Sequence, residues 1–363
     1  MKTMQIKKGI IKKMAIAFVG FLGVSFSGCS SSEEPFDLND ERECKIIVQI
    51  QPTGSQQREI SSSSPDSGAI VINENNLNNL SLYMISAENA SFPLVSRYLG
   101  HEGDIHEYEA TLNVDSDYVR YDSLTKKFYL TGRLVAMANM PSGNPLHPLN
   151  QSPFDLTQVG VLGSLPMWGV TQIKDLEVKV NDRIDNGTTI ELLRSLPKFT
   201  FRLDDSIRDE FMISEVRASF DDFEQTAYCQ PGAALTASDT KDMDEEDWFN
   251  PAALNAAKGK NYLETISPER VVIYTGERTF DNAEFGSRYF ELTLSRKDGS
   301  GVPFTGKIYM CDYTPSGMPD FDRPFSRIVR NHDYHYVISL ASMEMIVSFR
   351  DWIYGGKVHI ELE

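Results

Sequence analysis

The chain has 363 residues, of which 41% are hydrophobic, so it is long enough to bury two medium-sized cores. Its 35 basic and 52 acidic side chains give a formal net charge of −17, and a chain this acidic repels phosphate backbones. Composition and charge therefore indicate a globular protein and argue against one that binds nucleic acid.

The first 28 residues have the pattern of a secretory signal. Lysines crowd the first 13 residues, and an apolar run from Met14 to Phe26 follows. This run is too short to span a membrane as a helix. Residues 1–28 are therefore predicted to be a signal peptide.

The end of this signal, FSGC, resembles a bacterial lipobox. The resemblance implies cleavage before Cys29 and a diacylglyceryl thioether, with acyl chains such as palmitate, on that cysteine. At about 0.8 kcal/mol per buried CH₂, several acyl chains form a durable membrane anchor. The alternative is a soluble secreted protein in which a cysteine stands here by chance.

An acidic tract poor in apolar residues follows the lipidation site. Residues 29–42 are predicted to be a flexible leash, because such a composition cannot bury a core. Acidic residues soon after the cysteine resemble the surface-export signal of Bacteroidetes lipoproteins. This resemblance implies export by the lipoprotein machinery to the cell outer membrane, facing outward.

Three further cysteines are widely scattered along the chain, at Cys44, Cys229 and Cys311. An odd number at such spacings is no disulfide framework, and no CxxC or Cys/His pair has metal-ligand spacing. We expect buried thiols, or one bridge at most.

Most of the remaining chain alternates apolar and polar residues with the period of a β-strand. Strands are expected at residues 44–50, 79–87, 126–140, 197–205, 271–276, 288–296, 306–313 and 334–342. Helical periodicity is scarce, although residues 250–259 (NPAALNAAKG) could hold one short helix.

Many short strands with long connections are typical of β-sandwiches. The fold class is therefore predicted to be all-β, with two tandem Greek-key, transthyretin-like sandwiches and few short helices. A break at residues 180–188 is expected to divide an N-terminal domain, residues 43–185, from a C-terminal domain, residues 186–363.

Motifs at three places resemble the fimbrillin family, whose members are subunits of type V pili. LPMWG at residues 165–169, followed by IELLRSLPKFTFRL at residues 190–203, is similar to the junction of the two domains in that family. RNHDYHYVISL and IVSFRDWIYGGKVHIELE, residues 330–340 and 346–363, are similar to its closing strands. The lipobox, leash, first strand and following arginine-containing loop agree as well.

The resemblance implies a protease cleavage site between Arg58 and Glu59. In the family, an arginine-specific surface protease cuts behind the first strand, and a terminal strand of the next subunit then fills the groove. Arg58 lies in a run of Ser, Gly, Gln and Pro, where nicking concentrates. The alternative is an ordinary surface arginine.

The two ends of the chain carry short amphipathic strands that could be exchanged. The displaced first strand would present Ile46, Val48 and Ile50 on one face, with Ile47 as an exception. The candidate donor strand presents Val358, Ile360 and Leu362. Strand addition takes its affinity from main-chain hydrogen bonds and its specificity from alternate side chains. Both strands could equally pair within their own domains.

Candidate catalytic and metal sites are weak. His332 and His335 would lie on opposite faces of a strand, and HEGDIH (residues 101–106) lacks a third ligand cluster. The acidic run at residues 242–248 lacks the glycine and the bidentate glutamate of an EF-hand. We expect no enzyme activity, metal or cofactor, and we expect Trp168, Trp248 and Trp352 to be core or interface anchors.

The sequence thus predicts a structural subunit of a surface fimbria that serves adhesion and has other fimbrial subunits as partners. One alternative is a lipid-retained anchor or minor subunit of the same pilus. Another is a surface glycan- or host-binding lipoprotein that does not polymerise.

Overall fold

The structure is a computed structural model. It describes residues 42–53, 72, 74–141, 147–150, 152–156, 158–159, 163–219, 226–250, 263–280, 286, 288–341 and 344–353. By its contacts, Glu41–Glu363 forms one compact unit, separate from Met1–Asp40. The predicted signal peptide and nearly all of the leash lie outside the described residues.

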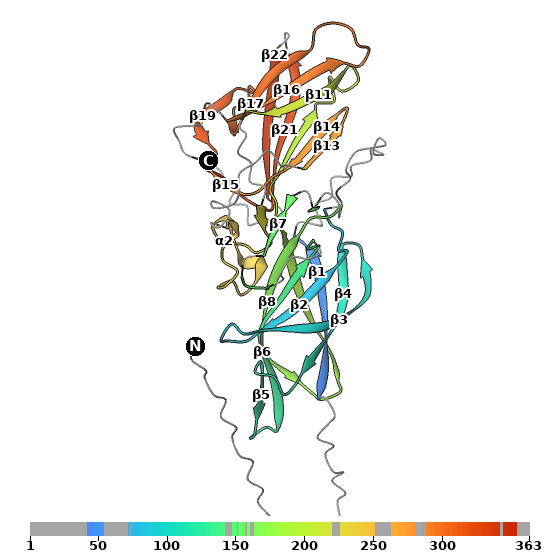
Figure 1. Ribbon diagram of the computed structural model, residues 1–363, viewed down its shortest axis with the longest axis vertical. Helices are drawn as coiled ribbons and strands as arrows, with labels where there is room; N and C mark the ends of the chain where they lie inside the picture. The colour runs from blue at the N-terminus through green and yellow to red at the C-terminus, as the bar shows by residue number, and fades with distance from the viewer. Residues whose placement is uncertain are drawn as a thin grey trace, which may run out of the picture. The chain divides into compact units, whose positions relative to one another are not determined.

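One large sheet contains most strands of the first half of the chain (Figure 1). Its strands are β1 (Glu43–Pro52), β2 (Leu80–Ile85), β3 (Ser91–Glu102), β4 (Ile105–Asn113), β5 (Val119–Asp122), β6 (Lys127–Ala138), β8 (Met167–Val178) and β9 (Arg183–Arg194). They are hydrogen-bonded in the order β2-β3-β4-β1-β9-β8-β6-β5, and β2 also pairs with β6. The sheet therefore closes on itself around a core.

The core inside this closed sheet is built by alternate residues of its strands. Ile46, Val48 and Ile50 of β1 pack in one buried cluster with residues of β2, β4, β6, β8 and β9. Because side chains alternate across a strand, one apolar face per strand is enough to fill the interior.

A five-stranded and a three-stranded sheet contain most strands of the second half. The first has the order β13 (Leu263–Ser267), β14 (Arg270–Tyr274), β10 (Lys198–Leu203), β21 (His332–Ala341) and β22 (Glu344–Ile353). The second has the order β11 (Phe211–Ala218), β16 (Tyr289–Arg296) and β17 (Phe304–Tyr309). Phe199 and Phe201 of β10 contact Phe290 of β16 at ring distances of 5.1 and 5.0 Å, so the two sheets share a core.

The remaining elements are short. They are the pairs β7 (Pro153–Asp155) with β12 (Thr226–Tyr228), β15 (Arg278–Thr279) with β20 (Arg327–Ile328) and β18 (Cys311–Tyr313) with β19 (Pro319–Pro324), the 3-10 turn η1 (Thr240–Asp242), and α2 (Glu245–Trp248). A third buried cluster joins β7, β8 and β14 and contains Trp168 and Trp248. Both tryptophans are core residues, as predicted. The side chain of Trp352 is not among those that the structure describes.

The structure confirms the all-β fold class and the eight predicted strands, while the Greek-key, transthyretin-like order stays a prediction. Residues 180–188, where the break was expected, form the turn after β8 and the start of β9. The boundary expected at residue 185 falls inside β9, whose pairing with β1 continues to Leu192. The helix expected at residues 250–259 lies almost wholly outside the described residues.

The three cysteines described by the structure are free and buried, as expected. Burial raises the pKa of Cys44 to about 11 and those of Cys229 and Cys311 to about 12. Such thiols stay protonated at neutral pH and act as small apolar groups.

Candidate functional site

The first strand, β1, lies in the interior of its sheet. It pairs with β4 in antiparallel register, from Glu43↔Asn113 to Ile50↔His106. On its other side it pairs with β9 in parallel register, from Lys45↔Arg183 to Pro52↔Leu192. Removal of β1 would therefore leave unpaired backbone groups on two facing strands, which are a template for another strand.

The apolar face of β1 is completely enclosed. Ile46, Val48 and Ile50 have no exposed surface, and Cys44 is 1% exposed. Ile47, the predicted exception to the alternation, is also buried. Burial of the three alternate residues stabilises the strand by about 5–9 kcal/mol at roughly 1.5–3 kcal/mol each, before ordering costs.

An ion cluster holds the polar face of β1. The buried carboxylate of Glu109 on β4 lies 3.4 Å from Lys45 of β1. It also lies 3.2 Å from Arg97 of β3 and 3.5 Å from Arg183 of β9. One acidic side chain thus pairs with cations from three strands, which favours the observed register of β1 against its neighbours.

A buried polar contact holds the end of β1. The backbone amide of Thr53 donates to the carbonyl of Leu192 at 2.9 Å. The Thr53 hydroxyl lies 2.9 Å from Oδ1 of Asn331, the residue before β21. The exit of the first strand is therefore tied to the strand system of the second half of the chain.

Arg194, at the end of β9, binds the chain on both sides of the segment that contains Arg58. Its Nη1 donates to the carbonyl of Thr53 at 2.8 Å, and its Nη2 donates to Oδ1 of Asn75 at 2.6 Å. Arg194 is only 3% exposed. A single guanidinium thus clamps both ends of the segment, a role that nothing in the sequence indicates. We call this contact the Arg194 clamp.

A second charged cluster adjoins the clamp. The carboxylate of Glu74 lies 2.8 Å from Lys198 and accepts a hydrogen bond from the Tyr274 hydroxyl at 2.6 Å. Lys198 also lies 3.1 Å from Asp333 of β21. Burial alone would raise the pKa of Glu74, but the charges of Lys198 and Arg194, with the two hydrogen bonds, lower it to about 2.

The remaining predicted site residues lie outside the described residues. These are the lipidation site Cys29, the cleavage pair Arg58 and Glu59, and the candidate donor residues Val358, Ile360 and Leu362.

The histidines of β21 do not form a metal site with each other. His332 makes an edge contact with Trp248 and lies 3.3 Å from Glu245. His335 lies three residues after His332 on the same strand, so its side chain points to the opposite face of the sheet. In the part of the chain that the structure describes, no group of three or more His, Cys, Asp and Glu side chains could hold a metal ion.

The acidic run at residues 242–248 has a structural role. The side chain of Asp244 caps α2 and forms a capping box with Asp247. Glu246 makes a two-pronged ion pair with Arg327, with distances of 3.3 and 2.7 Å. These carboxylates of the acidic run therefore bind backbone amides of α2 and the guanidinium of Arg327.

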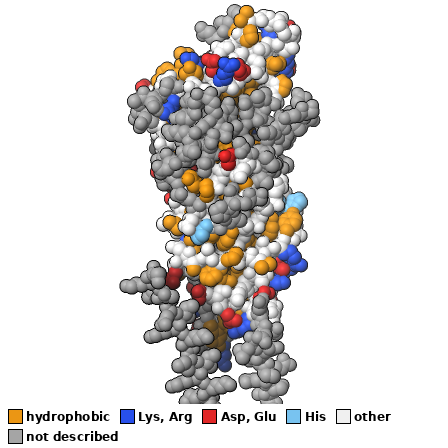
Figure 2. Space-filling model, viewed as in Figure 1, with side chains coloured by type: hydrophobic (Ala, Val, Ile, Leu, Met, Phe, Trp, Pro, Cys, Tyr) orange, Lys and Arg blue, Asp and Glu red, His pale blue; other side chains and the backbone are white. Residues whose placement is uncertain are grey.

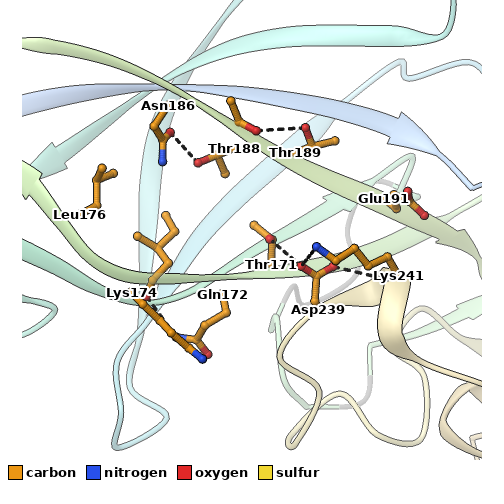
Figure 3. Close-up of a pocket in the computed structure, with 12 residues that line it drawn as sticks. Thr171, Gln172, Lys174, Leu176, Asn186, Thr188, Thr189, Glu191, Asp239 and Lys241 are labelled. Atoms are coloured by element: carbon orange, nitrogen blue, oxygen red, sulfur yellow. Dashed lines mark hydrogen bonds and ion pairs between the residues drawn. The ribbon is translucent and has the colours of Figure 1, made fainter.

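A polar cavity of about 370 Å³ opens where β8 and β9 separate (Figure 3). These strands pair only at Met167↔Arg194 and Trp168↔Leu193, and a Cβ on the next residue, Gly169, would lie 2.1 Å from a carbonyl of β9. Beyond this close approach the cavity is lined mostly by polar side chains of β8 and β9, together with Asp239 and Lys241 at η1. Among them, Asp239 accepts from the Thr171 hydroxyl at 3.1 Å and pairs with Lys241 at 3.2 Å.

A second cavity, of about 650 Å³, lies beside the hairpin of β3 and β4. It is lined by both histidines of HEGDIH, together with two tyrosines and an asparagine-rich segment.

On the face shown in Figure 2, basic and acidic side chains lie interspersed and form no broad basic area among the described residues.

No family model and no curated protein match the chain, but solved structures do. The tip fimbrial protein Mfa3 from Porphyromonas gingivalis, with a C-terminal truncation, has a TM-score of 0.47 and 10% identity over 86% of this chain and 100% of its own. A fimbrial assembly protein from Parabacteroides distasonis has a TM-score of 0.40 and 13% identity over 85% of this chain and 98% of its own. The fimbrial anchor protein Mfa2 from Porphyromonas gingivalis has a TM-score of 0.28 and 10% identity over 86% of this chain and 98% of its own.

These neighbours are fimbrial proteins. None of the helices in the described ranges is long and apolar enough to cross a bilayer.

Proposed function

We propose that the protein is a structural subunit of a cell-surface fimbria, exported as a lipoprotein and assembled by protease-triggered strand exchange, and that the fimbria serves adhesion. The observation that carries the proposal is the place of β1: it is an interior strand with an enclosed apolar face. It ends at Pro52, six residues before Arg58 in the sequence. A cut at Arg58 would separate this strand from the rest of the chain.

Loss of β1 would create a groove that favours an incoming strand. β4 and β9 would each expose a row of unpaired N–H and C=O groups, and the core between them would lose three enclosed side chains. A strand with alternate Val358, Ile360 and Leu362 offers the same period and similar volumes. The main-chain hydrogen bonds supply affinity, and the alternate pockets supply register.

The precursor holds its own strand until cleavage. The Arg194 clamp and the Glu109 cluster bind β1 and its exit, so the uncut chain is self-complemented. Intramolecular pairing also has a high effective concentration, which keeps an external donor strand out. Assembly therefore waits for the arginine-specific surface protease.

A lipid-retained anchor or minor subunit of the same pilus is the second candidate. Cys29 precedes β1 in the chain, so a cut at Arg58 would also remove the lipid. A subunit that escapes the cut would keep both its lipid and its first strand. It would stay at the outer membrane, accept no donor strand, and could still donate its own C-terminal strand.

Treatment of the purified precursor with an arginine-specific protease tests the proposal. We expect one early cut at Arg58, found by mass spectrometry, and ladders of oligomers on a gel without boiling. Deletion of residues 357–363 should abolish the ladders, and Arg58→Ala should permit export but prevent assembly.

Arg42→Ala is the matched control, since Arg42 lies just before β1 and makes a surface ion pair with Asp115. This variant should form ladders like the parent chain. Normal fibres from Arg58→Ala would refute strand exchange after cleavage, and an intact lipidated chain at the base of native fibres would identify the anchor. Glycan binding without oligomers would support the third class, a non-polymerising lipoprotein.

A further inference from the structure

The cavity beside the β3–β4 hairpin has the composition of a binding site. We call it the hairpin pocket; its lining residues include Asn75, Asn76, Asn78, Asn79, Tyr98, His101, Asp104, His106 and Tyr108. Its volume of about 650 Å³ is in the range of small-molecule sites, roughly 300–1,000 Å³. None of its lining residues is Lys or Arg.

Four aromatic rings form one wall of the hairpin pocket. Tyr98 lies 5.3 Å from Tyr108, its partner across the two strands, measured between ring centroids. His101 stacks on its own cross-strand partner, His106, at 5.5 Å and an angle of 25°. The Tyr98 hydroxyl lies 2.6 Å from Nδ1 of His101, which joins the two pairs.

A β-bulge explains why these rings share a face. Residues three apart on a regular strand point to opposite faces, as Tyr98 and His101 would. The register of β3 shifts between Tyr98 and Gly100, so both residues face the same side as their partners on β4. Bulges often re-aim side chains at functional sites.

Another part of the lining is the asparagine-rich segment at residues 75–79, which is held in place by Asn139. Asn139, buried at the end of β6, donates from Nδ2 to the carbonyls of Asn76 and Leu165 at 2.6 and 2.9 Å. Its Oδ1 accepts from the backbone amide of Asn78 at 2.8 Å. The segment is therefore pre-organised, and the side chains of Asn78 and Asn79 are exposed.

We propose that the hairpin pocket binds a neutral saccharide. The C–H face of a sugar ring packs on electron-rich aromatic faces, and Tyr98 offers such a face with 48% of its surface exposed. Amide groups both donate and accept, so short asparagines can satisfy neighbouring sugar hydroxyls. Asp104 provides one further acceptor, 3.4 Å from Nδ2 of Asn75.

The charges of the pocket argue against other ligand classes. Without Lys or Arg it has no partner for a sulfate, phosphate or sialate group. Burial and the neighbouring His101 lower the pKa of His106, while Asp104 opposes this shift, so His106 supplies little positive charge at neutral pH. A metal ion is disfavoured because Tyr98 engages Nδ1 of His101 and no third ligand completes a set among the described residues.

The test is binding of the uncleaved, unlipidated chain to an array of neutral oligosaccharides that end in galactose, glucose, mannose, fucose or N-acetylhexosamine, with sialylated versions alongside. We expect binding to at least one neutral glycan, with affinity then measured by calorimetry. Tyr98→Ala should weaken it at least tenfold, and Asn79→Ala should weaken it severalfold. Tyr121→Ala, which removes another exposed tyrosine on β5, should leave it unchanged.

Each variant should be shown to melt within a few degrees of the parent, so that loss of binding is not loss of fold. The absence of any bound neutral glycan would overturn the proposal, as would binding confined to sialylated forms or unaffected by Tyr98→Ala. Zn²⁺ binding that His101→Ala abolishes would assign the pocket to a metal instead. Tyr98→Ala should still assemble after cleavage, so this test is independent of strand exchange.

Discussion

At the scale of single residues, Arg194 links the first strand to the segment that is proposed to be cut. Its two terminal nitrogens reach the carbonyl of Thr53 and the side chain of Asn75, which lie on either side of that segment. Lysine keeps the charge but has one terminal nitrogen in place of the planar fork, so it cannot place a separate nitrogen on each acceptor. The geometry of the clamp is therefore that of arginine.

Arg194→Lys should destabilise the precursor by about 1–3 kcal/mol, since at least one buried acceptor loses its donor. It should also speed the cut at Arg58, because the ends of the segment are released. Urea unfolding and the rate of cleavage measure the two effects. Arg120→Lys, at an exposed ion pair with Asp175, is the control and should change neither. Unaltered cleavage in Arg194→Lys would show that the clamp does not restrain the segment.

Glu74 should make the free energy of unfolding depend on pH in the acid range. Its folded-state pKa of about 2 lies below its ordinary value of 4.5. The stability from the ionised carboxylate is therefore present above pH 4.5 and is lost as the pH falls towards 2. The size of the shift corresponds to roughly 3 kcal/mol.

Glu74→Gln tests this through urea unfolding between pH 6 and pH 2.5. The parent chain should be more stable than the variant at pH 6, and the difference should shrink steadily below pH 4.5. Glu88→Gln, at an exposed carboxylate, should run parallel to the parent at every pH. A constant difference between Glu74→Gln and the parent would mean that Glu74 is not the titrating group.

At the scale of elements, β1 behaves as an inserted ligand of its own sheet. It touches β4 and β9 by main-chain pairing and the core by alternate side chains, which is how a bound peptide would be recognised. A free peptide of the same sequence should therefore replace it.

The folded precursor is first cut, and its first strand is removed. A peptide of residues 43–53 should then bind in the vacated groove. Binding should raise the melting temperature and block the formation of ladders. The same peptide with Val48→Asp should fail, because a carboxylate would enter an enclosed apolar site. A peptide with Gln49→Lys, which places a charge on the half-buried polar face opposite Glu107, should still bind. Equal binding by all three peptides would contradict insertion in the native register.

The elements also show what the sequence could and could not predict. The sequence predicted β1 from its alternating apolar and polar residues, because one side of the strand faces the core and the other does not. The parallel pairing of β1 with β9 joins residues about 140 apart, so no local pattern signals it. No local pattern indicates the bulge in β3 either. The sequence therefore predicted a connection at HEGDIH, whereas its two histidines lie beside Tyr98 and Tyr108.

At the scale of the whole molecule, the residue that follows β1 contacts the second half of the chain. Thr53 meets Asn331 directly, and Arg194 donates its backbone amide to the same Oδ1 at 3.2 Å. Asn331 has a φ of 60°, a left-handed conformation that Asn adopts more readily than most residues. The sequence offered RNHDYHY as a family motif, but it could not show that Asn331 is a partner of the first strand.

This connection gives a prediction about where the molecule loosens after cleavage. Removal of β1 should increase hydrogen exchange at the amides of β4 and β9 that it covered, since they lose their partners. Removal of Thr53 with the strand should also increase exchange near Asn331 and at the start of β21, because Asn331 loses the hydrogen bond from the Thr53 hydroxyl. The far end of β21, which pairs with β10 and β22, should not change.

Thr53→Val in the uncleaved chain is the matched comparison, because it removes the hydroxyl and leaves β1 in place. It should reproduce the increase near Asn331 without the increase at β4 and β9. If cleavage changed exchange only in the closed sheet, the two halves would respond independently, and Thr53 would be a local contact alone. If both regions respond, filling the groove with a donor strand should restore β4 and β9 but leave Asn331 unprotected, unless the donor supplies a hydroxyl at the place of Thr53.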